Sequence, residues 1–371
     1  MKNDFSCIIC VADINITEVL DQFLAGLALP EVFIQRAKQM SMKDKHGFLG
    51  RQITQLEESR AMIYRIYVPS EYETGMVNRI VDITDLKMGG RGCIVVQHID
   101  HYRSSHLHFD TEKLETVCGK TGRATQKEHA LISCIVPRGE GSALAEALLE
   151  LGICVPIVFF GTGVGLRDRL GLMRITVPIE KEIIWFIVPA SDAILVEKII
   201  IPRAGLDIPG KGFMYTMYIH APVVNLRVRH GKRAHAATME QIIAALDEVR
   251  GSSDWRRFGS RKHDSAGRHR SSSTRALFFI GEEQDVEVFR KVAIECGARG
   301  ATLNELELRS YTATPHETAK TSHSRLLCDI VITKAVEEKI MENLAKTNLL
   351  DGSRHCGLKT FDVEMPSVIR K

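Results

Sequence analysis

The stretch VPASDAILVEKIIIPRAGLDIPGKGFMYTMYI, Val188 to Ile219, occurs a second time in the chain in related form. It aligns without a gap on VPSEYETGMVNRIVDITDLKMGGRGCIVVQHI, Val68 to Ile99. The coinciding positions include Pro69 and Pro189, Gly90 and Gly210, Arg91 and Lys211, and Gly92 and Gly212. Repetition at a fixed spacing indicates an architecture assembled from copies of one structural unit.

The periodicity of the second repeat predicts its elements. Continuous apolar runs indicate buried strands, and apolar residues at i, i+3, i+4 and i+7 indicate an amphipathic helix. Strands are expected at ALISCIV, VPIVFF, EIIWFIV and GFMYTMYI. Helices are expected over Ser142–Leu151 and around VEKIII, the second one capped by Ser191 or Asp192. The order is strand, helix, strand, long loop, strand, helix, glycine loop, strand.

The C-terminal third shows the same order with less identity. Strands are expected at RALFFI, ATLNELEL, RLLCDIVIT and LKTFDVEM, and helices along Val286–Cys296 and Val336–Leu344. Asp351–Gly357 takes the place of the glycine loop. Three βαββαβ units predict an α+β protein of three tandem ferredoxin-like domains. Because each such sheet has one open face, we expect the three to pack around one axis as a single-chain pseudo-trimer.

Composition shifts place the domain boundaries. We expect domains over residues 1–110, 128–250 and 276–371, the second with an extra C-terminal helix from Met239 to Val249. A short polar linker, Thr111–Glu128, separates the first two. The segment 251–275 is rich in Ser, Gly and Arg, which is typical of a flexible basic tether. An arm that contacts an anion is the alternative interpretation of the tether.

The bulk composition narrows the class of protein. The chain has 371 residues, 44% of them hydrophobic, and a net charge of +3, which does not suggest a nucleic-acid partner. Its apolar runs are shorter than the ~20 residues of a membrane-spanning helix, so no stable membrane insertion is expected. Nine cysteines without framework spacing favour free thiols in the cytoplasm. Cys7 and Cys10 lie three apart on a predicted strand, hence on opposite faces.

The second repeat resembles the PII family of nitrogen-regulatory signal-transduction proteins. The resemblance rests on four motifs in the family's order: EALLELGI (Glu146–Ile153), IVP (Ile187–Pro189), IPGKGF (Ile208–Phe213) at the B-loop and LRVRHG (Leu226–Gly231) at the C-loop. It implies ferredoxin-like domains around a threefold axis, with ATP or ADP as an effector in clefts between neighbours. It also implies a T-loop that reports the ligand to a target protein, an enzyme or a transporter.

The residues themselves favour phosphate binding. A glycine loop between a helix and a strand can direct successive N–H groups toward an oxyanion. Two arginines spaced two apart on an extended segment point the same way. The expected nucleotide-binding residues are Gly210, Lys211, Gly212, Arg227 and Arg229, and in the first repeat Gly90, Arg91 and Gly92.

The predicted T-loop of the second repeat departs from the family pattern. Where the family has Gly-Phe-Gly-Arg-Gln, this chain has Gly163, Val164, Gly165, Leu166 and Arg167. Gly163, Gly165 and Arg167 are further candidates for the nucleotide site. The departures argue against 2-oxoglutarate as a co-ligand. The first repeat contains GFLGRQ, Gly47–Gln52, but further from its strand than the family places it.

Two other functions remain open at this stage. The chain could be a protein-binding scaffold that responds to no ligand. It could also bind a transition metal through the histidines of QHIDHYRSSHLHFD, which are His98, His101, His106 and His108. Since no Ser–His–Asp or paired-carboxylate spacing points to catalysis, we do not expect an enzyme. A monomer is expected, with further self-association left open.

Overall fold

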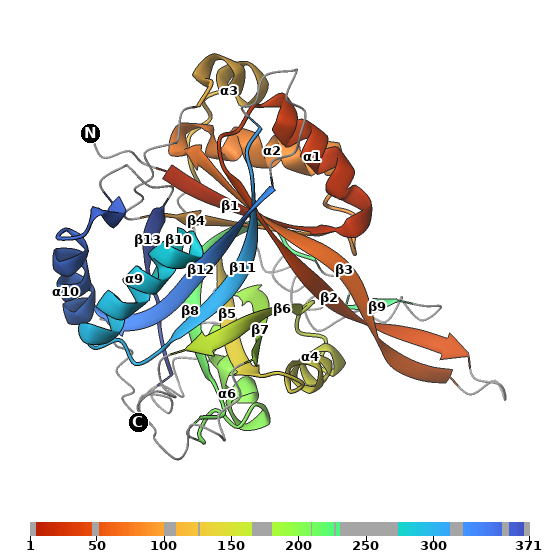
Figure 1. The fold of residues 1–371 in the computed structure, drawn as a ribbon. Coiled ribbons are helices and arrows are strands. Elements are labelled where there is room, and N and C mark those ends of the chain that lie inside the picture. The colour runs from red at the N-terminus through yellow and green to blue at the C-terminus, as the bar shows by residue number, and fades with distance from the viewer. Residues whose placement is uncertain are drawn as a thin grey trace.

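The computed structural model describes residues 5–46, 52–99, 109–124, 127–164, 180–208, 210–225, 228–230, 274–311, 322–350 and 356–366. In these ranges the protein has a mixed α/β fold with seven α-helices arranged around strands that form one sheet (Figure 1). The strands and helices fall into three successive units of the same order.

Unit 1 begins the chain. Its elements are β1 (Phe5–Asp13), η1 (Ile14–Ile16), α1 (Thr17–Gly26), β2 (Val32–His46), β3 (Gln52–Pro69), η2 (Ser70–Tyr72), α2 (Glu73–Thr84) and β4 (Gly92–His98). Helix α3 (Thr111–Cys118) follows. Unit 2 contains β5 (His129–Pro137), α4 (Gly141–Glu150), β6 (Ile157–Val164), β7 (Glu180–Pro189), α6 (Ala193–Arg203) and β8 (Phe213–Val223), with the short strand β9 (Arg229–His230) after it.

Unit 3 ends the chain. Its elements are β10 (Thr274–Gly281), α9 (Glu283–Glu295), β11 (Ala301–Arg309), β12 (Ser322–Thr333), α10 (Lys334–Leu344), η4 (Asn348–Leu350) and β13 (Gly357–Asp362). Every strand and helix predicted for units 2 and 3 is therefore present, apart from the helix at Met239–Val249, which lies outside the described residues. Strand β10 starts at Thr274, so the last two residues of the predicted tether belong to unit 3. Asp192 occupies the N-cap position of α6, as predicted, but its side chain makes no capping hydrogen bond; Ser191 Oγ donates to Asp192 Oδ1 at 2.9 Å.

The three units share one strand order. Within the sheet the orders are β4-β1-β3-β2, β8-β5-β7-β6 and β13-β10-β12-β11, so each first strand lies between the third and the fourth. All these neighbours within a unit are antiparallel. The second and fourth strands are thus the two edge strands of each unit.

On their free edges, the second strands also pair with one another. Strand β2 pairs with β6 at Lys38 and Gln39, and β6 pairs with β11 at Gly163. Strand β11 also pairs with β2 through Glu307–Arg309, so each of the three second strands pairs with the other two. An unpaired edge strand exposes N–H and C=O groups, and these contacts satisfy them. The periodicity of a strand does not identify its partner, so these pairings were not predictable from the sequence.

Each unit buries one sheet face under its own helices and the other at the centre. The central apolar core contains residues from all three units, among them Ile9, Trp185 and Phe278. Three further cores lie between each sheet and its helices. Cys7 lies in the central core and Cys10 in the outer core of unit 1, which confirms their predicted opposite faces. All nine cysteines are free thiols.

The predicted polar linker is partly helical. Helix α3 starts after Asp110, whose carboxylate accepts a hydrogen bond from the Lys113 N–H at 3.0 Å. Its Leu114 is fully buried against unit 1. Helix α2 approaches so closely that a Cβ at Gly75 would overlap the Cys118 carbonyl. The interpretation of this segment as a polar linker missed the helix, because only Leu114 and Cys118 form its buried face.

The loop expected between the second and third strands of unit 1 is mostly a β-ribbon. Strands β2 and β3 stay paired as far as His46 and Gln52, and the ribbon extends away from the rest of the molecule (Figure 1). Ion pairs Lys38–Glu58 and Lys43–Glu57, at 2.5 and 2.6 Å, lie across it. Its base packs on unit 2, because Met40 and Met42 belong to the outer core of that unit.

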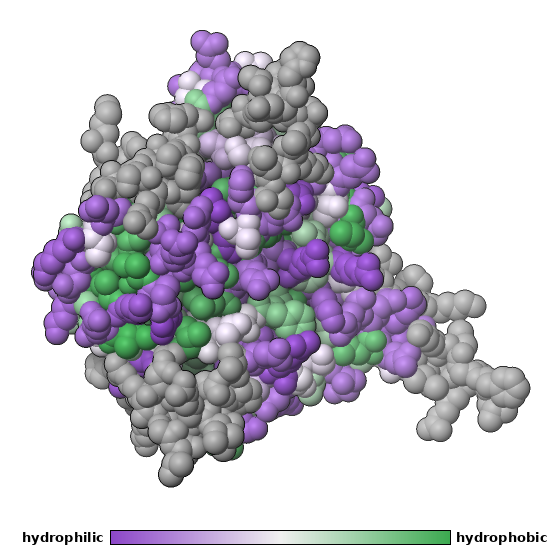
Figure 2. Space-filling view, viewed as in Figure 1, coloured by the Kyte–Doolittle hydropathy of each residue, from purple (hydrophilic) through white to green (hydrophobic). Residues whose placement is uncertain are grey.

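Several predictions fall on parts of the chain that the structure does not describe. These are the loop 165–179, the helix expected at Met239–Val249 and nearly all of the basic tether. No helix in the described ranges is long and apolar enough to cross a membrane. Figure 2 shows polar residues over most of one face, with apolar residues gathered beside α9, where Val288 is 39% exposed.

Candidate functional site

The two glycine loops adopt the same conformation. In unit 1, the N–H of Met88 donates to the Asp85 carbonyl and the N–H of Arg91 to the Met88 carbonyl. In unit 2, Ile208 and Lys211 make the equivalent hydrogen bonds to Gly205 and Ile208. Gly90 and Gly210 have φ values of 93° and 86°, which explains why glycine occupies both positions. The predicted likeness of the two loops is therefore confirmed in their backbones.

The second glycine of each loop serves the fold. A Cβ at Gly92 would overlap the carbonyl oxygen of Val11, and one at Gly212 would overlap that of Ile135. The crowding comes from the neighbouring first strand of the same unit. Gly212 was expected among the nucleotide-binding residues, but the close approach seen at it is made by the backbone of Ile135.

The loop of unit 1 meets the segment that follows β8 of unit 2. The N–H of Gly90 donates to Asn225 Oδ1 at 3.0 Å, and Asn225 Nδ2 donates to Gln39 Oε1 at 2.8 Å. Asn225 and Gln39 are 7% and 4% exposed. One buried amide thus connects the glycine loop of unit 1 to the base of the β2–β3 ribbon. We call Gln39, Gly90, Arg91 and Asn225 the junction site.

Strand β9 brings the predicted arginine motif to the same place. It pairs in parallel with β2, Arg229 opposite Met42, and the N–H of Met42 donates to the Val228 carbonyl at 2.8 Å. The side chain of Arg229 and the whole of Arg227 lie outside what the structure describes. The backbone on either side of Arg227 nonetheless lies beside unit 1.

Arg91 gives the junction site a cation. Its Nη1 donates to the Thr84 carbonyl at 2.8 Å and lies 3.4 Å from Asp85 Oδ2. About a third of the side chain, 34%, is exposed. Gln39 Nε2 is buried and has no hydrogen-bond partner among the described residues. The junction site therefore contains a backbone N–H, a guanidinium and an amide, three kinds of donor from which an oxyanion can accept.

Lys211 lies in the other loop and already has an anionic partner. Its ammonium is 3.0 Å from Glu140 Oε1, and both side chains are partly exposed. Glu140 immediately precedes helix α4 of the same unit. The structure therefore divides the predicted residues between two loops, and it brings the segment around Arg227 to Gly90 and Arg91. Gly163 lies in β6 opposite Thr302 of unit 3, while Gly165 and Arg167 are outside the described ranges.

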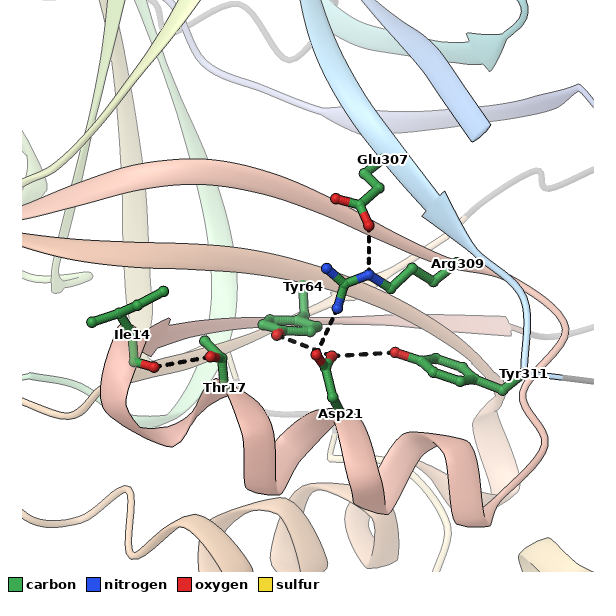
Figure 3. A network of polar contacts seen from close by, with 7 residues as sticks. All are labelled: Ile14, Thr17, Asp21, Tyr64, Glu307, Arg309 and Tyr311. Carbon is green, nitrogen blue, oxygen red and sulfur yellow. Dashed lines mark hydrogen bonds and ion pairs between the residues drawn. The ribbon is translucent and has the colours of Figure 1, made fainter. Parts of the chain in front are cut away.

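The junction between units 3 and 1 is closed by a network of fixed polar contacts (Figure 3). Arg309, at the end of β11, is 2.6 Å from Asp21 of α1 and 2.6 Å from Glu307. The hydroxyls of Tyr64 and Tyr311 donate to Asp21 Oδ1 at 3.1 and 3.2 Å. Burial and the adjacent Asp21 raise the pKa of both tyrosines. This network holds units 1 and 3 together. The Arg309 guanidinium is already paired with Asp21 and Glu307.

The histidine segment can be assessed only at its start. His98 Nε2 lies 3.1 Å from Glu73 Oε2, and Glu73 also accepts hydrogen bonds from Ser6 and the Ala124 N–H. Burial opposes ionisation of Glu73, but these hydrogen bonds prevail and lower its pKa. His101, His106 and His108 lie outside the described ranges. The described residues alone contain no cluster of three metal-ligating side chains.

Two residues of the junction site were missed by sequence reasoning. Asn225 stands two places before Arg227 and carries no motif of its own. Gln39 lies inside a long strand. The glutamine motif noted in the first repeat was GFLGRQ, of which Gly47–Arg51 lie outside the described residues. Contacts between residues 135 positions apart, such as that of Gly90 with Asn225, leave no local signal.

No family model and no curated protein matches the chain. Among solved structures, the chain is similar to a GlnK–ATP complex from B. subtilis. The identity is 17%, and the match covers 28% of this chain and 90% of the GlnK chain with a TM-score of 0.23. A likeness of this size establishes neither the fold nor a ligand of the present protein.

Proposed function

We propose that the protein is a PII-like regulator made of three ferredoxin-like domains around a pseudo-threefold axis. It binds ATP or ADP at the junction site and controls a partner protein without catalysing a reaction. The first domain comprises residues 1–110 with helix α3 packed on it, the second residues 128–250 and the third residues 274–371. Nine free thiols suit the reducing cytoplasm, where we place it.

The observation that carries the proposal is the meeting of two motifs from different units. The glycine loop of unit 1 and the arginine-containing segment of unit 2 are adjacent through the Gly90–Asn225 hydrogen bond. Each motif alone is weak evidence for phosphate binding. Together they place backbone N–H groups, Arg91 and the chain around Arg227 at one interface between units. A cleft between neighbouring domains is a common place for a small ligand.

The β2–β3 ribbon is the part of unit 1 suited to report occupancy. It begins at Gln39, which Asn225 holds, and it projects from the rest of the molecule. A ligand that takes the Gly90 N–H must displace Asn225 Oδ1 and so disturb the contact with Gln39. Binding would thereby be coupled to the ribbon through one side chain, provided that the two states differ in affinity.

The loop of unit 2 is the less favoured site. Both loop cations have a carboxylate neighbour, but Glu140 Oε1 lies 3.0 Å from Lys211 and Asp85 Oδ2 lies 3.4 Å from Arg91. The closer carboxylate competes more strongly with a phosphate for its cation. This difference between two loops of equal conformation supplies the matched comparison for an experiment.

We expect Arg91→Ala to weaken ATP and ADP binding about 10- to 100-fold, because a charge-assisted hydrogen bond contributes roughly 1.5–3 kcal/mol. Lys211→Ala should leave the affinity within about twofold of wild type. Isothermal titration calorimetry on the full chain gives both values, with circular dichroism to confirm that the variants are folded.

The outcomes separate the alternatives. Loss of affinity in Lys211→Ala with none in Arg91→Ala moves the site to the loop of unit 2. If the wild-type protein binds neither ATP nor ADP at millimolar concentration, the proposal is wrong and the scaffold function takes its place.

A further inference from the structure

The centre of the molecule contains charged residues where an unbroken apolar core would be expected. Arg65 of β3, Asp329 of β12 and Lys359 of β13 are 2%, 7% and 1% exposed. They line a cavity of ≈ 20 Å³. The other polar side chains around it are Gln97, Ser133, Tyr215 and Asn304. Burying polar groups costs free energy unless they are paired, so this cavity requires an explanation.

Strand register shows that the charges occupy equivalent positions in the three units. The fifth residues of the first strands are Ile9, Ser133 and Phe278. Their partners on the third strands are Arg65, Trp185 and Asp329. Their partners on the fourth strands are Val95, Tyr215 and Lys359. Three identical units would place three like charges here, whereas this chain places a cation, an indole and a carboxylate.

Each charged group contacts a unit other than its own. The Arg65 guanidinium lies 5.7 Å from the ring of Trp185, which belongs to unit 2. Tyr215 of unit 2 donates its hydroxyl hydrogen to Asp329 Oδ2 at 2.7 Å. Lys359 Nζ lies 3.8 Å from Cys7 Sγ of unit 1. The polar centre therefore connects all three units and depends on their order around the axis.

Five polar atoms of these lining residues have no hydrogen-bond partner within the described part of the protein. They are Arg65 Nη1, Gln97 Oε1, Ser133 Oγ, Asn304 Oδ1 and Asp329 Oδ1. The guanidinium donates, the two amide oxygens accept, and the Ser133 hydroxyl and the Asp329 carboxyl can do either. Buried polar groups are almost always hydrogen-bonded, to protein or to ordered water. A shared occupant of the cavity would satisfy several of them at once.

We propose that this cavity is a built site for one buried water molecule, which joins the three units by hydrogen bonds. A volume of ≈ 20 Å³ exceeds the roughly 10–15 Å³ that one water needs. Water accepts from Arg65 and donates to the amide oxygens of Gln97 and Asn304. A halide ion would face these two acceptor oxygens, and a metal cation would face the guanidinium.

A crystal structure of the full chain at high resolution, from crystals soaked in sodium bromide, tests the assignment. We expect one ordered peak within about 3.2 Å of Arg65 Nη1 and Asp329 Oδ1, without an anomalous bromine signal. A bromine peak there would make the site an anion site, and an empty cavity would mean that the centre is dry. Either result overturns the proposal.

Thermal unfolding of variants tests the link between units. Arg65→Met and Asp329→Leu should each lower Tm by about 5 °C or more, and the double variant should recover part of the loss. The surface pair Arg290 and Glu287 on α9 is the control, because Arg290→Met and Glu287→Leu should have small, additive effects. Additive losses at Arg65 and Asp329 would show that the two groups do not share a site. Should the single variants fail to fold, the bromide experiment still decides.

Discussion

Asp329→Asn should remove a loss of stability that the wild-type protein suffers as pH rises from about 4 to about 7. Burial raises the pKa of Asp329 from 3.8 to about 7, although the Tyr215 hydroxyl, Lys359 and Arg65 oppose the shift. Below the unfolded-state pKa, both states carry the proton and the group costs nothing. Above it, the unfolded chain releases the proton while the folded protein retains it, so folding loses about 1.4 kcal/mol per pH unit. The loss ends near the folded-state pKa, at a total on the order of 4 kcal/mol.

Asparagine has nearly the same volume, can accept the Tyr215 hydrogen bond and does not ionise. The difference in unfolding free energy between variant and wild type should therefore grow in favour of the variant across this pH range. Urea denaturation at pH 4, 5.5, 7 and 8 measures it. Asp82→Asn, on the exposed side of α2, is the matched control and should show no such trend. A pH-independent difference for Asp329→Asn would mean that this carboxyl ionises as freely as an exposed one.

Gly92→Ala should destabilise the protein by about 3 kcal/mol or more. Gly92 has φ 140°, which an L residue adopts only with strain of roughly 1–3 kcal/mol. Its added Cβ would also overlap the Val11 carbonyl, a backbone atom of the central strand of unit 1. Because β1 and β4 pair through this point, relief of the overlap requires the two strands to separate.

Gly26→Ala is the control for that substitution. Gly26 ends helix α1 and has no atom within 4 Å of the position of its Cβ, so alanine should be neutral or slightly stabilising. Chemical denaturation of both variants gives the comparison. If Gly92→Ala were as stable as the wild-type protein, Gly92 would not approach the Val11 carbonyl as closely as described, and the account would be wrong.

Much of the local structure of units 2 and 3 could be predicted from apolar periodicity. Runs such as ALISCIV and RLLCDIVIT are strands because both of their faces are buried, one under helices and one at the centre. The two glycine loops could be predicted because their glycines coincide when the repeats are aligned. Each of these glycines has a positive φ, which other residues rarely adopt. These features depend on short stretches of chain.

The relations between units could not be predicted in this way. The pairing of β2 with both β6 and β11, the Gly90–Asn225 contact and the polar centre all join residues far apart in the chain. Arg65 offered one clue, since it is a charged residue within the apolar run AMIYRIYV, Ala61 to Val68. Its partners on other units could be identified only from the three-dimensional arrangement.

The central claim is that a nucleotide phosphate takes the Gly90 N–H at the junction site. A structure of the full chain crystallised with ADP tests it most directly. The account predicts phosphate oxygens within hydrogen-bond distance of the Gly90 N–H and the Arg91 guanidinium, with Asn225 Oδ1 displaced from Gly90. Clear density for ADP at Gly210–Gly212, or an unchanged Gly90–Asn225 hydrogen bond at saturating ADP, would contradict it.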